Sequence, residues 1–171
     1  MQPTALTIKS TAGIINQLVS LVNIVVPNTT NVIQVNAIWD TGATATVITD
    51  NIVKALGFIP TGFSNVNTAN GSTIQNTYII DVVLPTGIVV KDVTVTGATA
   101  LSGGCEVLIG MDIIGLGDLS ITNYKGVTCM SFRIPSLHEI DYVKDLHFKL
   151  TPNILAGKQG SNLTPKKKKR K

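Results

Sequence analysis

Apolar residues in this chain come in short runs, and turn-forming residues separate the runs. The runs are rich in Val, Ile and Thr, which favour strands, while Gly, Pro and Asn favour the turns between them. The pattern predicts strands over residues 18–26, 35–39, 45–48, 77–84, 88–90, 93–96, 107–109, 119–122 and 127–132. All of these runs are far too short to cross a bilayer, so we expect no membrane partner.

Two short helices and one conspicuous hairpin complete the pattern. A helix is predicted over 50–56, with Thr49 as its cap and Gly57 as its stop. A second helical pattern follows Gly110, where Asp112 is expected to cap the first amides. After a loop over 58–65, the Asn-Gly pair in 66–74 is typical of a type I′ hairpin. The class is therefore all-β with one or two short helices.

Composition supports this class and limits the partners. The chain has 171 residues, enough for one domain, and is 44% hydrophobic and 14% charged. Its net charge of +4 arises at the end of the chain, because six of its fourteen basic residues lie in 166–171. Without them the chain has eight basic and ten acidic residues, so we expect no nucleic acid partner, except weakly through the basic tail.

The cysteines and the N-terminus suggest a compartment. Cys105 and Cys129 are too few for a disulfide framework, and the N-terminus shows no signal-peptide pattern. We therefore expect a cytoplasmic protein with reduced thiols.

The most informative stretch is an apolar strand that stops at a carboxylate. Residues 35–39 lead into Asp40, and Thr41, Gly42 and Ala43 follow. On its own, Asp-Thr-Gly fits an ordinary Asx-turn as well as a catalytic loop.

A second segment favours the catalytic interpretation. About 70 residues later, Leu108 and Ile109 run into Gly110 and a short helical pattern. Together with the hairpin between them, the two segments resemble the retropepsins, the single-domain aspartic proteases of retroviruses and their cellular and bacterial relatives. The resemblance covers roughly 18–135 and implies a closed β-barrel of the acid-protease fold, with a flap hairpin, in a homodimer. It also implies an extended peptide or protein as substrate and no cofactor or metal.

The resemblance assigns roles to individual residues and divides the chain. The catalytic loop would be Asp40, Thr41 and Gly42; the substrate-binding residues Ala43, Ala69, Asn70, Gly71 and Ser72; and the structural support Leu108, Ile109 and Gly110. The expected parts are an N-terminal extension (1–17), the protease domain (18–135), a C-terminal segment that could lie at the dimer interface (136–151) and a disordered basic tail (152–171).

The mechanism implied by the resemblance needs two carboxylates, one as base toward a water and one as acid toward the scissile carbonyl. Asp-Thr-Gly occurs once and the chain has no internal repeat, so the second Asp40 must come from a twofold-related copy. Ala43 lacks the hydroxyl that two-lobed relatives often place there, and we expect a pH optimum of about 5–7. Retroviral members pair an Asp and an Arg at the positions of Thr44 and Met111, so this chain needs another stabilising contact.

Other functions stay open. A catalytically silent module that dimerises and binds peptide would share the same fold. A metal hydrolase has weaker support, because His138 and His147, with Glu139 and Asp141 nearby, lack metal-ligand spacing. A serine or cysteine hydrolase is weaker still, because no Gly-x-Ser-x-Gly occurs and neither cysteine has a marked His partner.

Overall fold

The computed structural model describes residues 2–68 and 71–146. The chain divides into two units, Met1–Leu137 and His138–Lys171, and each is described by itself.

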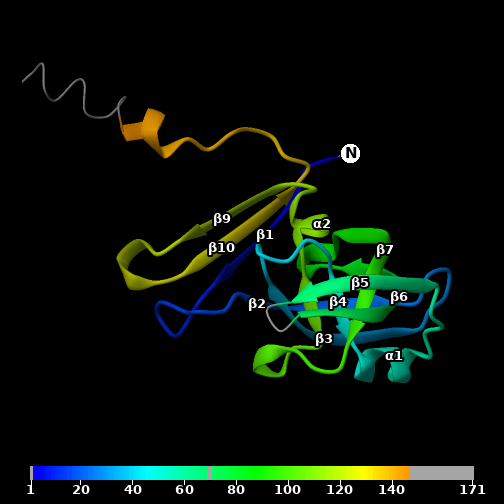
Figure 1. The fold of residues 1–171 in the computed structure, drawn as a ribbon. Helices are drawn as coiled ribbons and strands as arrows, with labels where there is room; N and C mark the ends of the chain where they lie inside the picture. The colour runs from blue at the N-terminus through cyan, green and yellow to red at the C-terminus, as the bar shows by residue number, and fades with distance from the viewer. Residues whose placement is uncertain (1, 69–70, 147–171) are drawn as a thin grey trace, which may run out of the picture. The chain divides into compact units, whose positions relative to one another are not determined.

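The first unit contains a closed β-barrel (Figure 1). Its strands are β2 (Val19–Val25), β3 (Val32–Trp39), β4 (Val47–Thr49), β5 (Gly62–Thr68), β6 (Gly71–Val83), β7 (Val89–Ala98) and β8 (Val107–Ile109). They are hydrogen-bonded in the order β2-β3-β8-β4-β7-β6-β5, and β2 also pairs with β6, which closes the ring. The predicted all-β class and closed barrel are confirmed.

Alternation of side chains along the strands builds the barrel core. Val22 and Ile24 on β2, and Ile80 and Val82 on β6, are each two residues apart and at most 2% exposed. Successive side chains on a strand point to opposite faces, so each of these pairs fills the interior from one face of its strand. The barrel therefore forms a rigid support for the loops at its strand ends.

Two short helices lie beside the barrel strands. They are α1 (Asp50–Leu56) and α2 (Met111–Ile114). Gly57 ends α1 in the left-handed conformation, with φ of 67°, as the sequence predicts. The predicted side-chain cap of Thr49 is wrong, because its hydroxyl donates to the Glu106 carboxylate instead of accepting a helix amide. Three 3₁₀ turns complete the unit: Pro85–Gly87, Ser102–Gly104 and Tyr124–Gly126.

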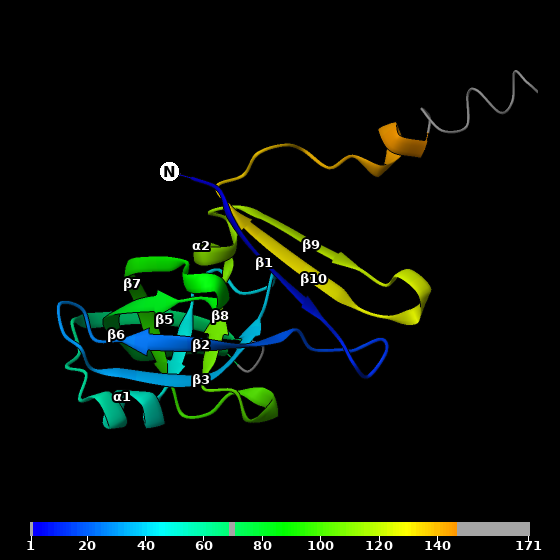
Figure 2. The ribbon, with the colours of Figure 1, turned by 180° about the vertical axis from the view of Figure 1, so that it is seen from behind.

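A separate three-stranded sheet extends away from the barrel, as Figures 1 and 2 show from opposite sides. Its order is β1 (Thr4–Lys9), β10 (Cys129–Ile134) and β9 (Asp118–Thr122), all antiparallel. The predicted hairpin of β9 and β10 is present, whereas β1 lies in the segment 1–17 where no element was predicted. Phe132 on β10 packs its ring against Trp39 on β3, with 5.1 Å between ring centroids, which connects this sheet to the barrel.

Two further predictions need correction. The strand β5 begins at Gly62, so the segment 58–65 is not all loop. The strands predicted at 88–90 and 93–96 are one strand, β7, with a bulge. At the bulge Asp92 has φ of 54°, and its amide donates to the Asp81 carboxylate at 2.8 Å. This contact keeps the strand continuous across the irregular residue.

The second unit is described only as far as residue 146. Residues 142–146 are helical, and Lys144 forms ion pairs with Glu139 at 3.3 Å and Asp141 at 3.2 Å. The basic tail and His147 lie outside the described residues, so the predictions for them stay predictions. Nowhere in residues 2–68 and 71–146 is a helix long and apolar enough to cross a membrane.

Candidate active site

Asp40 lies where β3 leaves the barrel. Its amide donates to the carbonyl of Ile109 on the neighbouring parallel strand β8, at 3.0 Å. The preceding Trp39 is buried, and its indole N–H donates to the Ser20 hydroxyl at 2.9 Å, which satisfies a buried polar group. The end of β3 is thus fixed on two sides, and Trp39 packs in the core.

The loop after Asp40 folds back on the carboxylate. The Gly42 amide donates to Asp40 Oδ1 at 2.8 Å, and the Ala43 amide donates to the Asp40 carbonyl at 3.3 Å. Asp40 and Ala43 are half-buried, while Thr41 and Gly42 are exposed. Two hydrogen bonds thus shape this loop, and the second carboxylate oxygen of Asp40, Oδ2, lies on it near the surface of the chain.

Gly110 passes directly behind this loop. A Cβ on Gly110 would lie 2.6 Å from both the carbonyl carbon and the carbonyl oxygen of Ala45, closer than real Cβ atoms come. The next two residues continue the contact: the Met111 amide donates to the Ala43 carbonyl at 2.8 Å, and the Asp112 amide to the Thr44 carbonyl at 3.2 Å. The structure thus brings Ile109 and Gly110, two of the predicted support residues, against the predicted catalytic loop.

A part-buried polar contact that the sequence did not reveal joins the same two segments. Thr46 is fully buried, and its amide and hydroxyl both donate to the Asp112 carboxylate, at 2.9 and 2.8 Å. Asp112 also accepts the Ile113 amide at 2.9 Å from inside the first turn of α2, but the N-cap of this helix is Gly110 and no side chain caps it, so the predicted cap is only partly right. No local signal marks Thr46, because its partner lies 66 residues away.

The predicted flap is the hairpin of β5 and β6. Of its predicted substrate-binding residues, Ala69 and Asn70 lie outside the described residues, while Gly71 has φ of 115° and the Ser72 hydroxyl donates to the Asn67 side chain at 2.5 Å. Phe63 is 78% exposed and Ile74 is 74% exposed. Two large apolar side chains are thus presented by the hairpin.

Strand alternation shows which face they occupy. On β6, Ile74 lies on the same face as Tyr78 and Ile80, the buried side chains that point into the barrel. Phe63 is directly opposite Asn76, which shares that face. The hairpin therefore extends beyond the core, and Phe63 and Ile74 are exposed on the face that points into the barrel further along β6.

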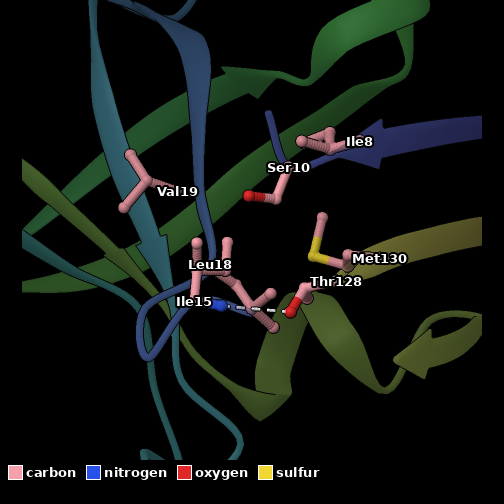
Figure 3. A pocket seen from close by; sticks show the side chains of 7 residues that line it. All are labelled: Ile8, Ser10, Ile15, Leu18, Val19, Thr128 and Met130. Carbon is pink, nitrogen blue, oxygen red and sulfur yellow. Dashed lines mark hydrogen bonds between the residues drawn. The ribbon is translucent and has the colours of Figure 1, made fainter. Parts of the chain in front are cut away.

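A small apolar pocket lies elsewhere (Figure 3). Its lining comes from β1 and the segment that follows it, from the start of β2, and from β10 and the residue before it: Ile8, Ser10, Ile15, Leu18, Val19, Thr128 and Met130. None of these residues belongs to the Asp40 loop or to the flap, so this pocket is separate from the candidate site.

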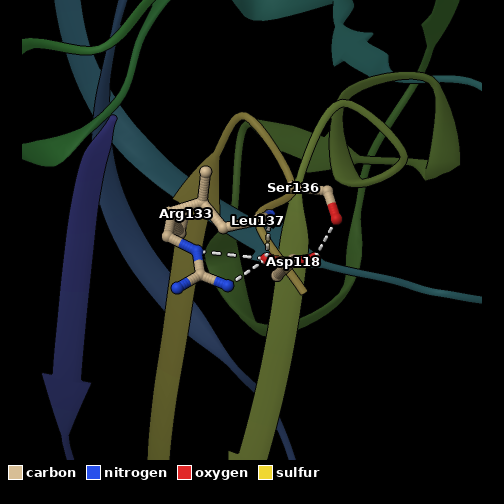
Figure 4. Close-up of polar contacts among 4 residues, drawn as sticks. All are labelled: Asp118, Arg133, Ser136 and Leu137. Atoms are coloured by element: carbon tan, nitrogen blue, oxygen red, sulfur yellow. Dashed lines mark hydrogen bonds and ion pairs between the residues drawn. The ribbon is translucent and has the colours of Figure 1, made fainter. Parts of the chain in front are cut away.

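Asp118 holds the end of β10 against the start of β9 (Figure 4). Its carboxylate accepts the Ser136 hydroxyl at 2.5 Å, the Nε and Nη2 groups of Arg133, and the Leu137 amide at 3.0 Å. The hydrogen bond from Ser136, then those from Arg133 and Leu137, hold the pKa of Asp118 well below its usual range. This carboxylate therefore has a structural role.

The described residues offer no cluster of three or more His, Cys, Asp or Glu side chains suited to a metal ion. The arrangement at Asp40 is a single carboxylate on a loop that is held by hydrogen bonds to residues 109–112.

Comparison with known families decides the identity. The family described as "gag-polyprotein putative aspartyl protease" matches residues 26–115, slightly more than half of the chain. The chain belongs to this family. Its match spans the Asp40 loop, the hairpin of β5 and β6, and Gly110, and the resemblance to retropepsin-like aspartic proteases is confirmed. Among curated proteins, none matches the sequence.

Several solved structures are similar to this aspartyl protease family member at low identity. A retropepsin-like aspartic protease from Rickettsia conorii is 17% identical, with 78% of this chain and 97% of that chain covered and a TM-score of 0.47. EIAV protease in an inhibitor complex is 19% identical, with 58% and 86% covered and a TM-score of 0.46. The retroviral protease-like domain of Ddi1 from Leishmania major is 17% identical, with 71% and 95% covered and a TM-score of 0.41.

Proposed function

We propose that this protein is an aspartic endopeptidase that works as a homodimer. The observation that carries the proposal is the half-buried Asp40 at the end of β3, on a loop whose one Asp-Thr-Gly sequence is braced by Gly110. A single loop supplies one carboxylate, and the reaction needs two. The second Asp40 comes from a twofold-related subunit, so the catalytic centre lies at the dimer interface.

The two carboxylates share one proton. At about 3 Å and an effective dielectric constant of about 20, two negative charges repel by about 5.5 kcal/mol, so both do not ionise at moderate pH. The ionised carboxylate takes a proton from the attacking water, and the protonated one donates to the carbonyl oxygen of the scissile bond. Activity then has a bell-shaped pH profile whose two limbs belong to the pair.

The substrate is an extended peptide that lies under the flap. The flap strands offer main-chain groups to an extended chain, in the manner of an added strand. The exposed Phe63 and Ile74 on the inner face of the flap favour apolar substrate side chains close to the cleaved bond. We propose that this preference for apolar side chains contributes to the substrate specificity of the enzyme.

A silent dimerisation or peptide-binding module is the alternative. The two functions are separated by a peptide-library cleavage assay from pH 3 to 8 on the wild type and Asp40→Asn, with light scattering to measure the mass of both. Cleavage that Asp40→Asn abolishes, in a protein that keeps its mass, supports the endopeptidase. A folded wild-type dimer that cleaves nothing at any pH supports the silent module.

A further inference from the structure

The Asp112 carboxylate and Thr46 connect two segments that both contact the Asp40 loop. The Thr46 amide donates to Asp112 Oδ2 at 2.9 Å, and the Thr46 hydroxyl donates to Asp112 Oδ1 at 2.8 Å. With its proton directed to Asp112, the same hydroxyl accepts the Gly110 amide at 3.2 Å. Thr46 thus uses its backbone and side chain to hold the start of α2 and the glycine before it.

These contacts fix one end of the catalytic loop. At the other end, the Asp40 amide is held by the Ile109 carbonyl at 3.0 Å. Between the two ends, the carbonyls of Ala43 and Thr44 accept the amides of Met111 and Asp112. Residues 40–46 are therefore bonded at both ends and in the middle to one short segment, 109–112.

The bonds to Asp112 are charge-assisted because its carboxylate is the acceptor, although Asp112 is itself exposed and solvent screens part of this gain. Hydrogen bonds to a charged group are about twice as strong as neutral ones, and Thr46 is fully buried, where an unpaired donor is costly. The substitution Thr46→Val keeps the shape of the side chain and removes the hydroxyl, so the contribution of the hydroxyl is measurable.

We propose that Asp112 is a positioning residue for Asp40: acting through Thr46, it holds the loop 40–46 in the geometry that catalysis needs. The inference rests on the proposed endopeptidase function. Catalysis is sensitive to small displacements of reacting groups, and a shift of about 1 Å costs about 100-fold in rate. Loosening the Thr46 contact therefore lowers kcat, while KM, which depends on contacts with the flap, changes little.

The test compares Thr46→Val and Asp112→Asn with the matched control Thr46→Ser, which keeps the hydroxyl. We expect kcat to fall by about tenfold or more in Thr46→Val and Asp112→Asn. KM should stay within about twofold of the wild type, and Thr46→Ser should retain wild-type kcat. The double variant Thr46→Val/Asp112→Asn should lose less than the sum of the two single variants, because both substitutions affect the bond between the Thr46 hydroxyl and Asp112 Oδ1.

Thermal unfolding and light scattering of every variant show whether it remains folded and keeps the wild-type mass at the assay temperature. If kcat falls only in proportion to the fraction of protein that is folded and dimeric, the inference is overturned, because a general structural role would give the same result. Wild-type kcat in Thr46→Val would overturn it as well.

Hydrogen exchange gives a readout that needs no activity. We expect the amides of Thr46 and Gly110 to exchange faster in Asp112→Asn, with the amides of β2 and β6 unchanged. Unchanged exchange at Thr46 and Gly110 would overturn the contact itself. A wild-type protein without activity would overturn the proposed function, and with it the catalytic role of the contact between Thr46 and Asp112. The exchange result would still decide whether this contact holds the loop.

Discussion

Gly110 lies so close to Ala45 that a methyl group on it would come within 2.6 Å of the Ala45 carbonyl carbon and oxygen. The close partner is backbone, which cannot rotate away as a flexible side chain would. The segment 109–112 can therefore pack behind the Asp40 loop only with glycine at position 110.

Gly110→Ala should displace the Asp40 loop and abolish activity. Overpacking of this kind costs about 2–3 kcal/mol of unfolding free energy, measured by urea denaturation. Gly57→Ala is the matched control: Gly57 has φ of 67° and nothing within 4 Å of the added Cβ. It should lose about 1–2 kcal/mol through backbone strain alone and keep its activity. Equal activities of the two variants would show that the fit at Gly110 does not matter for catalysis.

The hydrogen bond from the Trp39 indole to Ser20 predicts a second effect. Ser20→Ala leaves a buried N–H without its acceptor, and we expect a loss of about 1–3 kcal/mol in unfolding free energy. Ser64→Ala on the half-buried surface of β5 is a suitable control and should change stability by less than about 0.5 kcal/mol. Similar losses in both variants would indicate that the indole contact is not the cause.

The parts of the site that the sequence predicted are those with local signals. An apolar strand that stops at Asp40 and a second that stops at Gly110 are visible within a few residues each, and the structure places the two stretches side by side. The contact of Thr46 with Asp112 has no such signal, because a hydrogen bond between residues 66 positions apart depends on the folded barrel.

The departures in the fold have different causes. Thr49 has the residue type of a helix cap, but Glu106 competes for its hydroxyl once β8 is in place. The strand β1 does alternate, with Leu6 and Ile8 on one face and Thr7 and Lys9 on the other, but the run is short and its partner β10 lies more than 100 residues away. For Thr49 a tertiary partner outweighs the local preference, whereas for β1 a short local signal was missed. At the positions of Thr44 and Met111, the main chain of 111–112 bonds to the loop, and the Asp112 carboxylate accepts the Thr46 amide.

The lowered pKa of Asp118 predicts how stability depends on pH. Its folded pKa lies below the ordinary value of 3.8, so its ionised form stabilises the fold above about pH 4. That contribution is lost as the pH falls below about 4 toward the folded pKa. Thermal unfolding between pH 2 and 7 should therefore show a smaller acid-induced fall in Tm for Asp118→Asn than for the wild type. The exposed Asp145→Asn should instead follow the wild-type curve, and parallel curves for all three proteins would contradict the assignment.

The exposed apolar side chains of the hairpin of β5 and β6 are expected to affect substrate recognition. Phe63→Ser and Ile74→Ser remove apolar side chains that are already 78% and 74% exposed, so they should leave Tm nearly unchanged. If these side chains contact the substrate, KM should rise severalfold for peptides with apolar residues beside the cleaved bond and change little for polar ones. Val89→Ser, at an exposed apolar position on β7, is the control and should leave both values unaltered. A rise in KM that is equal for apolar and polar peptides would instead indicate that the substitutions alter the flap backbone, and the preference would have to come from another part of the cleft.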